Sequence, residues 1–362
     1  MMKRTYTLFS LLFILLFSCG NESEDQQDVF RVIPVNPNAD DELSLSDIAD
    51  EIEAVKLEET DESLIAMTTK VERTEDYIFI FDFSQQKIFQ FDDSGKFLQL
   101  IGKIGGGPEE VERPVGFSLD RMNGHIYIIG MRKIVVYDYN GDFVRYIRDY
   151  SFPNYTYFMN DTLEVFRTET KNLEGGGFLK FPTRYRVDPS TGGRIDSLEL
   201  TKVSLKNQMM FIMTDANYYS ESTDKTYFYL PVLFPEPFVR DTIYEARSSV
   251  FEPSLKLDFG ESAVSETGNK AVNIRSFFRS DRYLIVRYSY EGKAKLLIYD
   301  LEEYMSYNLD AGLDGGEHSD GEPVLITPLP AESNTYCFSA KILEGGSTEE
   351  PNPTLYFVKL KN

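Results

Sequence analysis

The chain has no tryptophan and, among its 362 residues, only two cysteines and two histidines. Zinc sites are usually built from several His and Cys side chains, so the sequence offers few residues that could form one. The motifs Gly-x-Ser-x-Gly, His-Glu-x-x-His and paired Cys-x-x-Cys do not occur. Support for zinc enzymes and for triad hydrolases is correspondingly weak.

Basic residues are in the minority, with 37 Lys and Arg against 59 Asp and Glu and a formal net charge of −22. So acidic a surface argues against nucleic acid as a partner and against direct adhesion to anionic lipid. After the N-terminus, no stretch approaches 18 apolar residues, so no further membrane span is expected.

An export pattern occupies the N-terminus. Lys3 and Arg4 precede an apolar run over residues 8–19 that is too short to span a bilayer comfortably. The residues Leu16-Phe17-Ser18-Cys19 resemble the lipobox of bacterial lipoproteins. That resemblance implies removal of residues 1–18, the predicted lipoprotein signal peptide, and lipidation of Cys19. A plain signal peptide with an incidental cysteine is the alternative.

Residues 19–44 are polar, acidic and without apolar periodicity, which predicts a flexible tether. The part over residues 20–28 is similar to the acidic export signal of surface-exposed lipoproteins in Bacteroidetes, although a solvated linker explains it as well. We therefore expect a protein of the cell envelope, anchored by lipid in the outer membrane and either periplasmic or surface-exposed.

With Cys19 lipidated, Cys337 has no partner for an intramolecular disulfide, and the fold must rest on its core. Cys337 lies in an apolar-rich run over residues 335–339, with no neighbouring base in the sequence. A buried structural thiol is expected there rather than a nucleophile.

A repeat dominates the rest of the chain: the strand pattern of residues 77–98 returns over residues 125–144. Each copy reads as two strands, a turn of the Asp/Asn-x-Gly type and a third strand, because Asp and Asn begin such turns and Gly supplies positive φ. Three residue pairs share an offset of 46 positions: Asp92/Asp138, Gly95/Gly141 and Phe97/Phe143.

Four degenerate copies follow, beginning near residues 162, 226, 283 and 335. Six units of about 50 residues each suit the blades of a β-propeller. We predict an all-β, six-bladed β-propeller over residues 45–362, closed by a strand near residues 55–57 or 64–71 that pairs into the last blade. One or two helical turns capped by Ser46 are expected over residues 45–52, with Ile48 and Ile52 on one face.

Three segments resemble the six-bladed β-propeller lipoproteins of Bacteroidetes: residues 45–58, the pattern from Asp92 to Phe97, and the glycine loop over residues 101–110. The loop is similar to the family's Gly-x-Gly-Pro-Gly-Glu sequence, but Glu109 stands where the family usually has Gly. The resemblance implies the propeller fold and, for most members, no assigned activity.

The glycine loop is the candidate ligand-binding loop. The absence of a following Gly-Lys-Ser/Thr argues against a phosphate cradle and favours a conformational role, joining the outer strand of one blade to the inner strand of the next. Its candidate residues are Gly105, Gly106, Gly107, Pro108, Glu109 and Glu110.

Residues 310–322 concentrate oxygen donors on a glycine-rich loop, which suits Ca²⁺, although a solvated loop between blades is the alternative. The candidate metal ligands are Asp310, Asp314, Glu317 and Asp320. No other cofactor is expected. Five tyrosines in less periodic stretches are predicted to be exposed and able to stack on sugars or peptide groups: Tyr150, Tyr155, Tyr157, Tyr218 and Tyr219.

These features favour a monomeric, membrane-tethered binding module whose ligand docks near the central channel or the loops between blades. Polysaccharide, peptide and envelope protein are all compatible ligands. An enzyme is the alternative: a hydrolase or lyase acting on sugar derivatives, with a divalent cation at the channel mouth. A structural partner in an outer-membrane complex is a third possibility.

Overall fold

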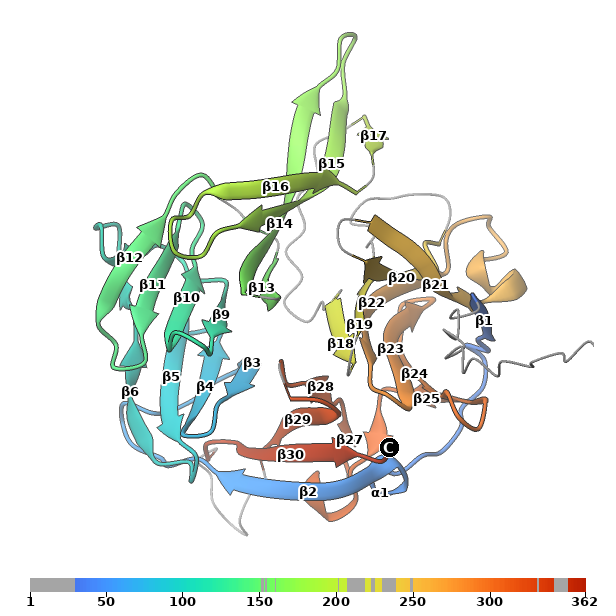
Figure 1. The fold of residues 1–362 in the computed structure, drawn as a ribbon. Helices are drawn as coiled ribbons and strands as arrows, with labels where there is room; N and C mark the ends of the chain where they lie inside the picture. Colours follow the sequence, from blue (N-terminus) through green and yellow to red (C-terminus); the bar gives the residue numbers. More distant parts are fainter. Residues whose placement is uncertain are drawn as a thin grey trace, which may run out of the picture.

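The computed structural model describes residues 30–150, 153, 155–159, 161–200, 202–206, 219–222, 225–229, 239–247, 250–330, 332–341 and 351–362. Six sheets of four or five strands stand around a central axis (Figure 1), which confirms the predicted six-bladed β-propeller. Cys19 and the predicted signal peptide lie outside the described residues.

Blades 1, 2, 3 and 5 each take four consecutive antiparallel strands, counted from the axis outwards. Blade 1 contains β3 (Thr68–Arg73), β4 (Tyr77–Asp82), β5 (Lys87–Asp92) and β6 (Phe97–Ile101). Blade 2 contains β9 (Gly116–Asp120), β10 (His125–Ile129), β11 (Ile134–Asp138) and β12 (Phe143–Ile147). Blade 3 contains β13 (Tyr155–Met159), β14 (Thr162–Asn172), β15 (Phe178–Val187) and β16 (Arg194–Glu199), with β17 (Val203–Leu205) beside β15. Blade 5 contains β22 (Val272–Arg279), β23 (Tyr283–Tyr290), β24 (Lys293–Asp300) and β25 (Met305–Asp310).

Blades 4 and 6 each take one strand from the N-terminal segment. Blade 4 contains β18 (Tyr219–Ser222), β19 (Lys225–Tyr229), β20 (Thr242–Arg247), β21 (Val250–Asp258) and, outermost, β1 (Arg31–Pro34). Blade 6 contains β28 (Thr327–Pro328), β29 (Thr335–Ala340), β30 (Thr354–Leu360) and, outermost, β2 (Ala49–Lys56).

The ring has two faces. The turn face carries the turns between the first and second and between the third and fourth strands of a blade. The loop face carries the connections from each blade to the next, and the turns between second and third strands. Short elements in those connections are β7 (Lys103–Ile104), β8 (Glu110–Val111), η1 (Gly260–Ala263), β26 (Leu313–Asp314), η2 (Gly316–His318) and β27 (Pro323–Val324).

The predicted Asp-x-Gly turns lie on the turn face of blades 1 and 2. Asp92 Oδ1 accepts the N–H groups of Ser94 and Lys96 at 3.0 and 2.9 Å, and Gly95 has φ +88°. Asp138 Oδ1 makes the equivalent pair of contacts in blade 2, both at 2.9 Å. The repeated sequence therefore builds the same turn twice, with Asp satisfying backbone donors and Gly supplying the left-handed conformation.

The ring is closed by β2, which pairs antiparallel with the last strand, β30, from Lys56 opposite Thr354 to Ala49 opposite Leu360. This confirms the predicted closure near residues 55–57, while the other candidate segment, residues 64–71, leads into β3 of blade 1. Of the one or two helical turns predicted over residues 45–52, one is present, as α1 (Leu45–Ile48). The cap is Ser44 and not the predicted Ser46, and Ile52 lies in β2.

Residues 31–34, included in the predicted tether, form β1, which pairs parallel with β21 of blade 4. Ile33 is completely buried there, and Val35 and Leu43 are buried in the following segment. The structure thus differs from the expectation of a flexible tether reaching residue 44, because these apolar side chains pack against the outer strands of the propeller.

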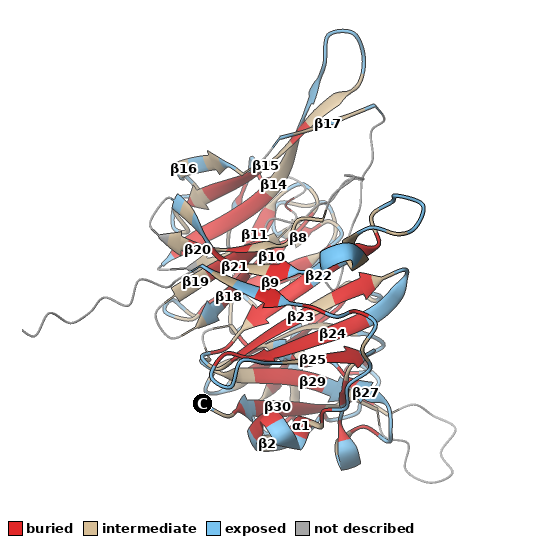
Figure 2. Cartoon of the chain, turned by 90° about the vertical axis from the view of Figure 1, so that its right-hand side faces the viewer, coloured by how far each residue is buried: buried red, intermediate tan, exposed pale blue. Residues whose placement is uncertain are grey.

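An apolar cluster fills each boundary between neighbouring blades, and Figure 2 shows burial following the strands. Among the described residues, the cluster between blades 3 and 4 is the smallest, with Phe166, Tyr219 and Phe228 as its buried members. Cys337 is buried between blades 6 and 1, as predicted, and burial raises the pKa of its thiol far above the ordinary value.

Candidate functional site

The predicted ligand-binding loop joins β6 of blade 1 to β9 of blade 2 on the loop face, which is the connection expected from the sequence. Glu110 Oε2 accepts the Gly107 N–H at 2.8 Å, and Lys133 Nζ donates to the Pro108 carbonyl at 2.8 Å. A Cβ atom at Gly105 would overlap the Glu110 carboxylate. These contacts give the glycines a conformational role, and ligand contact at residues 105–110 stays a prediction.

The four predicted calcium ligands are separately engaged or exposed. Asp310 forms an ion pair with Lys295, and Asp314 Oδ1 accepts a backbone hydrogen bond within its own loop at 2.9 Å. Glu317 and Asp320 are exposed. Across the described ranges, no group of three His, Cys, Asp or Glu side chains is arranged to hold a metal ion. Calcium at this loop stays a prediction that the metal content of the purified protein can check.

The tyrosines predicted to be exposed are largely packed between blades. Tyr150 and Tyr219 are buried, so the prediction is wrong for both. Tyr219 stacks on Tyr157 with ring centroids 4.3 Å apart, across the boundary of blades 4 and 3. Tyr155 is partly buried, and Tyr218 lies outside the described residues. Inter-blade packing uses these rings, which removes most of the predicted aromatic surface.

A charged cluster occupies the turn-face end of the central channel. Arg121 Nη2, just after β9 of blade 2, lies 3.3 Å from Glu72 Oε2 of blade 1. Lys70 Nζ lies 2.9 Å from the other carboxylate oxygen of Glu72, whose side chain is only 3% exposed. Arg121 also acts electrostatically on Glu221 of blade 4 and Glu332 of blade 6. Because these groups come from four blades, they meet at the axis.

Burial perturbs two carboxylates of this cluster. It raises the pKa of Glu332, while the charges of Arg73 and Arg121 act in the opposite direction. Partial desolvation likewise raises the pKa of Glu221, although its side chain keeps contact with solvent, and Tyr219 donates a hydrogen bond to it. Carboxyl groups with raised pKa values beside an arginine are suited to hold and release a proton.

This cluster was not predicted from the sequence, although the repeat contains a signal for it. Glu72-Arg73 at the end of β3 returns as Asp120-Arg121 at the end of β9, at the offset of 48 positions that the inner pairs of strands share. Charged pairs recurring at the ends of inner strands would have marked the channel mouth. The contributions of Glu221 and Glu332 carry no such pattern.

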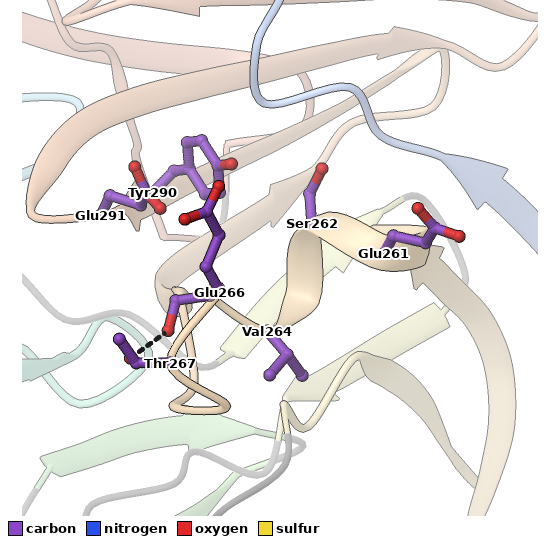
Figure 3. Close-up of a pocket in the computed structure, with 8 residues that line it drawn as sticks. Glu261, Ser262, Val264, Glu266, Thr267, Tyr290 and Glu291 are labelled. Carbon is purple, nitrogen blue, oxygen red and sulfur yellow. Dashed lines mark hydrogen bonds between the residues drawn. The ribbon is translucent and has the colours of Figure 1, made fainter.

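A second concave site lies on the loop face beside blade 5. The connection from β21 to β22 and the turn after β23 enclose an open pocket of about 680 Å³. Its lining includes three carboxylates, from Glu261, Glu266 and Glu291, and no lysine or arginine. In Figure 3, Glu266, Glu291 and Tyr290 gather at one end of the pocket, and Glu261 lies at the other. The site suits a ligand that is positively charged or rich in hydrogen-bond donors.

Comparison with known proteins identifies the family. The family model described as "Domain of unknown function (DUF4934)" matches residues 30–359.

The chain belongs to the DUF4934 family. The matched region begins at residue 30, just before β1, so this N-terminal strand is part of the family's domain. No curated protein sequence matches the chain.

Solved structures resemble this DUF4934 protein in fold. A protein of Bacteroides fragilis described as exported aligns with a TM-score of 0.59 at 18% identity, covering 92% of this chain and 100% of its own. A DUF4221 family member from Bacteroides vulgatus aligns with a TM-score of 0.47 at 11% identity, covering 89% of this chain and 99% of its own. At such identities the first likeness concerns the fold alone.

The helices in the described part of the chain are α1, η1 and η2. None of them has the length and apolar character needed to cross a membrane.

Proposed function

We propose that this protein is a lipid-anchored binding propeller of the cell envelope that takes a positively charged peptide segment on its loop face. The observation that carries the proposal is the pocket beside blade 5, where three carboxylates and Tyr290 line a concave surface free of basic residues. Pockets of about 300–1,000 Å³ suit small ligands or single side-chain clusters.

The chemistry of the pocket favours a cation over a neutral sugar. Carboxylates attract ammonium and guanidinium groups, and a tyrosine ring face adds a cation–π contribution. A neutral polysaccharide would use the same carboxylates only as hydrogen-bond acceptors. The N-terminal lipobox resemblance and the exported protein of similar fold support an envelope location.

Calorimetric titration with penta-lysine and with cellohexaose tests the proposal. Penta-lysine should bind the wild type more tightly than cellohexaose and should bind the variant Glu266→Gln/Glu291→Gln more weakly. Because the whole surface is acidic, the control is Glu302→Gln/Glu303→Gln, which removes two exposed charges at the turn-face end of the same blade. An equal loss of penta-lysine affinity in both variants would show that binding depends on general charge attraction and not on the pocket.

The channel mouth supports a second candidate, an enzyme acting by general acid catalysis. Its basis is the raised pKa of Glu332 and Glu221 around Arg121, with groups from four blades meeting at one point. A carboxyl group with a raised pKa is better suited to protonate a leaving group than an ordinary one. A sugar-derivative hydrolase is the class this arrangement fits.

A panel of 4-nitrophenyl glycosides tests that candidate. An enzyme should release 4-nitrophenolate, and Glu332→Gln should lose this activity while Glu303→Gln, an exposed change on the same face, keeps it. No release from any member of the panel would count against catalysis at the channel mouth and leave the binding proposal as the better one.

A further inference from the structure

The direction of β1 fixes the face of the propeller at which this strand begins. β1 pairs parallel with β21, with Arg31 opposite Leu255 and Pro34 opposite Asp258. β21 runs from the turn face to the loop face, where it continues into η1 and the pocket lining. β1 therefore also runs towards the loop face, and its first residue, Arg31, lies at its turn-face end.

Contacts along the next residues hold this segment against blade 5. The Asp41 N–H donates to the Asn308 carbonyl at 2.9 Å, and the Asn308 N–H donates to Asp41 Oδ2 at 2.8 Å. Lys295 Nζ donates to the Ala39 carbonyl at 3.1 Å. We call residues 31–44 the strap, because they cross the outside of blades 4 and 5 before β2 enters blade 6 (Figure 1).

The strap is anchored by side chains as well as by the backbone. Arg31 Nη1 donates to the Leu301 carbonyl of blade 5 at 3.3 Å, and its guanidinium lies 4.8 Å from the centre of the Tyr304 ring. Ile33 is fully buried in the cluster between blades 4 and 5. These contacts hold the N-terminal end of the strap at the outer edge of blades 4 and 5.

We infer that the propeller is presented with its turn face toward the membrane and its loop face, including the pocket, directed away from it. This rests on the proposed lipid anchor at Cys19, which joins the membrane to the turn-face end of β1. A ligand arriving from the side opposite the membrane would meet the loop face first. The channel mouth around Arg121 would face the lipid surface.

Energy transfer from the protein to the bilayer tests the orientation. Two single-cysteine labels sit at opposite ends of β24 in blade 5: Lys293→Cys on the loop face and Glu303→Cys just past its turn-face end, both at exposed positions. Eight residues of β24 separate these ends by ~25 Å. Cys337 is buried and stays unlabelled.

The acylated full chain is placed in phosphatidylcholine vesicles that contain a rhodamine-headgroup lipid. Transfer from the Glu303→Cys label should be roughly twofold more efficient than from Lys293→Cys, given that ~25 Å separation. Equal or reversed efficiencies would overturn the inference. Rapid hydrogen exchange of residues 31–34 on the vesicle would also overturn it, because the strap would then have detached.

The lipid anchor is tested separately. Mass spectrometry of the N-terminal peptide, and vesicle binding of Cys19→Ser, report on acylation alone. The chain from residue 20, held to nickel-lipid vesicles through an N-terminal hexahistidine, should give the same order of transfer efficiencies. A missing acyl group would therefore contradict the anchor, whereas the wrong order of transfer would contradict the orientation.

Discussion

Arg121 Nη2 lies 3.3 Å from Glu72 Oε2, and this ion pair joins blade 2 to blade 1 at the channel mouth. Glu72 is nearly inaccessible to solvent and keeps Lys70 as its other partner. Removing one member of a buried ion pair lowers stability more than removing one member of a surface pair, because it leaves a desolvated charge behind.

Arg121→Met should lower the free energy of unfolding by about 1–3 kcal/mol, less than the full effect of breaking a buried pair because Lys70 remains. Urea denaturation measures it. The matched control is Arg132→Met, which removes an exposed partner of Glu112 at 3.2 Å and should change stability by less than about 1 kcal/mol. Similar losses in both variants would contradict a special role for Glu72.

Glu164 of blade 3 is expected to make the stability of the fold depend on pH. It is 1% exposed beside Arg184 and Arg186, at 3.6 and 3.3 Å, with Asp196 of β16 and Tyr219 of β18 nearby. Burial raises the pKa of Glu164 from 4.5 to about 7, against the opposing effect of the arginines.

The folded protein therefore holds this proton more tightly than the unfolded chain does. The contribution of Glu164 to stability is complete below pH 4.5 and is lost as the pH rises through about 7. Glu164→Gln should flatten the decline of the melting temperature across that interval, whereas Glu174→Gln at the exposed tip between β14 and β15 should leave the curve unchanged. Parallel curves for wild type and Glu164→Gln would show that another group causes the dependence.

Gly95 on the turn face predicts a steric effect on ring closure. Its φ is +88°, and a Cβ atom there would overlap the Lys56 carbonyl oxygen of the closing strand. Gly95→Ala should therefore lower the melting temperature more than Gly176→Ala, which has φ +97° but open space around it. Backbone strain alone costs about 1–2 kcal/mol in either variant. The additional loss of stability in Gly95→Ala therefore measures the steric contact with β2.

Asn352, in the loop before β30, is predicted to stabilise the fold through hydrogen bonds to buried backbone groups. Its Oδ1 accepts the Ile65 N–H at 2.8 Å, and its Nδ2 donates to the carbonyls of Glu58 and Ser63 at 2.9 and 2.8 Å. Asn352→Ala leaves three backbone groups without their partner and should cost about 2–4 kcal/mol in urea denaturation. Asn140→Ala is the control and should cost less, because Asn140 is exposed and its Nδ2 donates to Asp138 Oδ2 at the long distance of 3.4 Å.

The fold was predictable because it repeats. The equivalent Asp92 and Asp138 turns identified blades 1 and 2, and alternating strands identified the others. The early end of α1 was not predictable in this way: Ile48 and Ile52 have helical spacing, but pairing of Ala49–Lys56 with β30 satisfies more backbone groups than another helical turn would.

The site was less predictable, because it is assembled from residues that do not repeat. Glu221 and Glu332 reach Arg121 only through the closed ring, so no local pattern marks them. Tyr150 and Tyr219 lie in irregular sequence yet are buried, because the boundary between blades, not strand periodicity, decides their exposure. β1 is only four residues long, too short for its alternation to stand out.

The pairing of β2 with β30 has a consequence for how the chain matures. The two strands are separated by roughly 300 residues, so the entropy of bringing them together is spent late. Because a chain is synthesised from its N-terminus, the edge of Ala49–Lys56 stays unpaired until the final residues, which include β30, have been made. Every newly made molecule of this protein thus passes through an interval in which the edge of this strand is open to pairing with another chain.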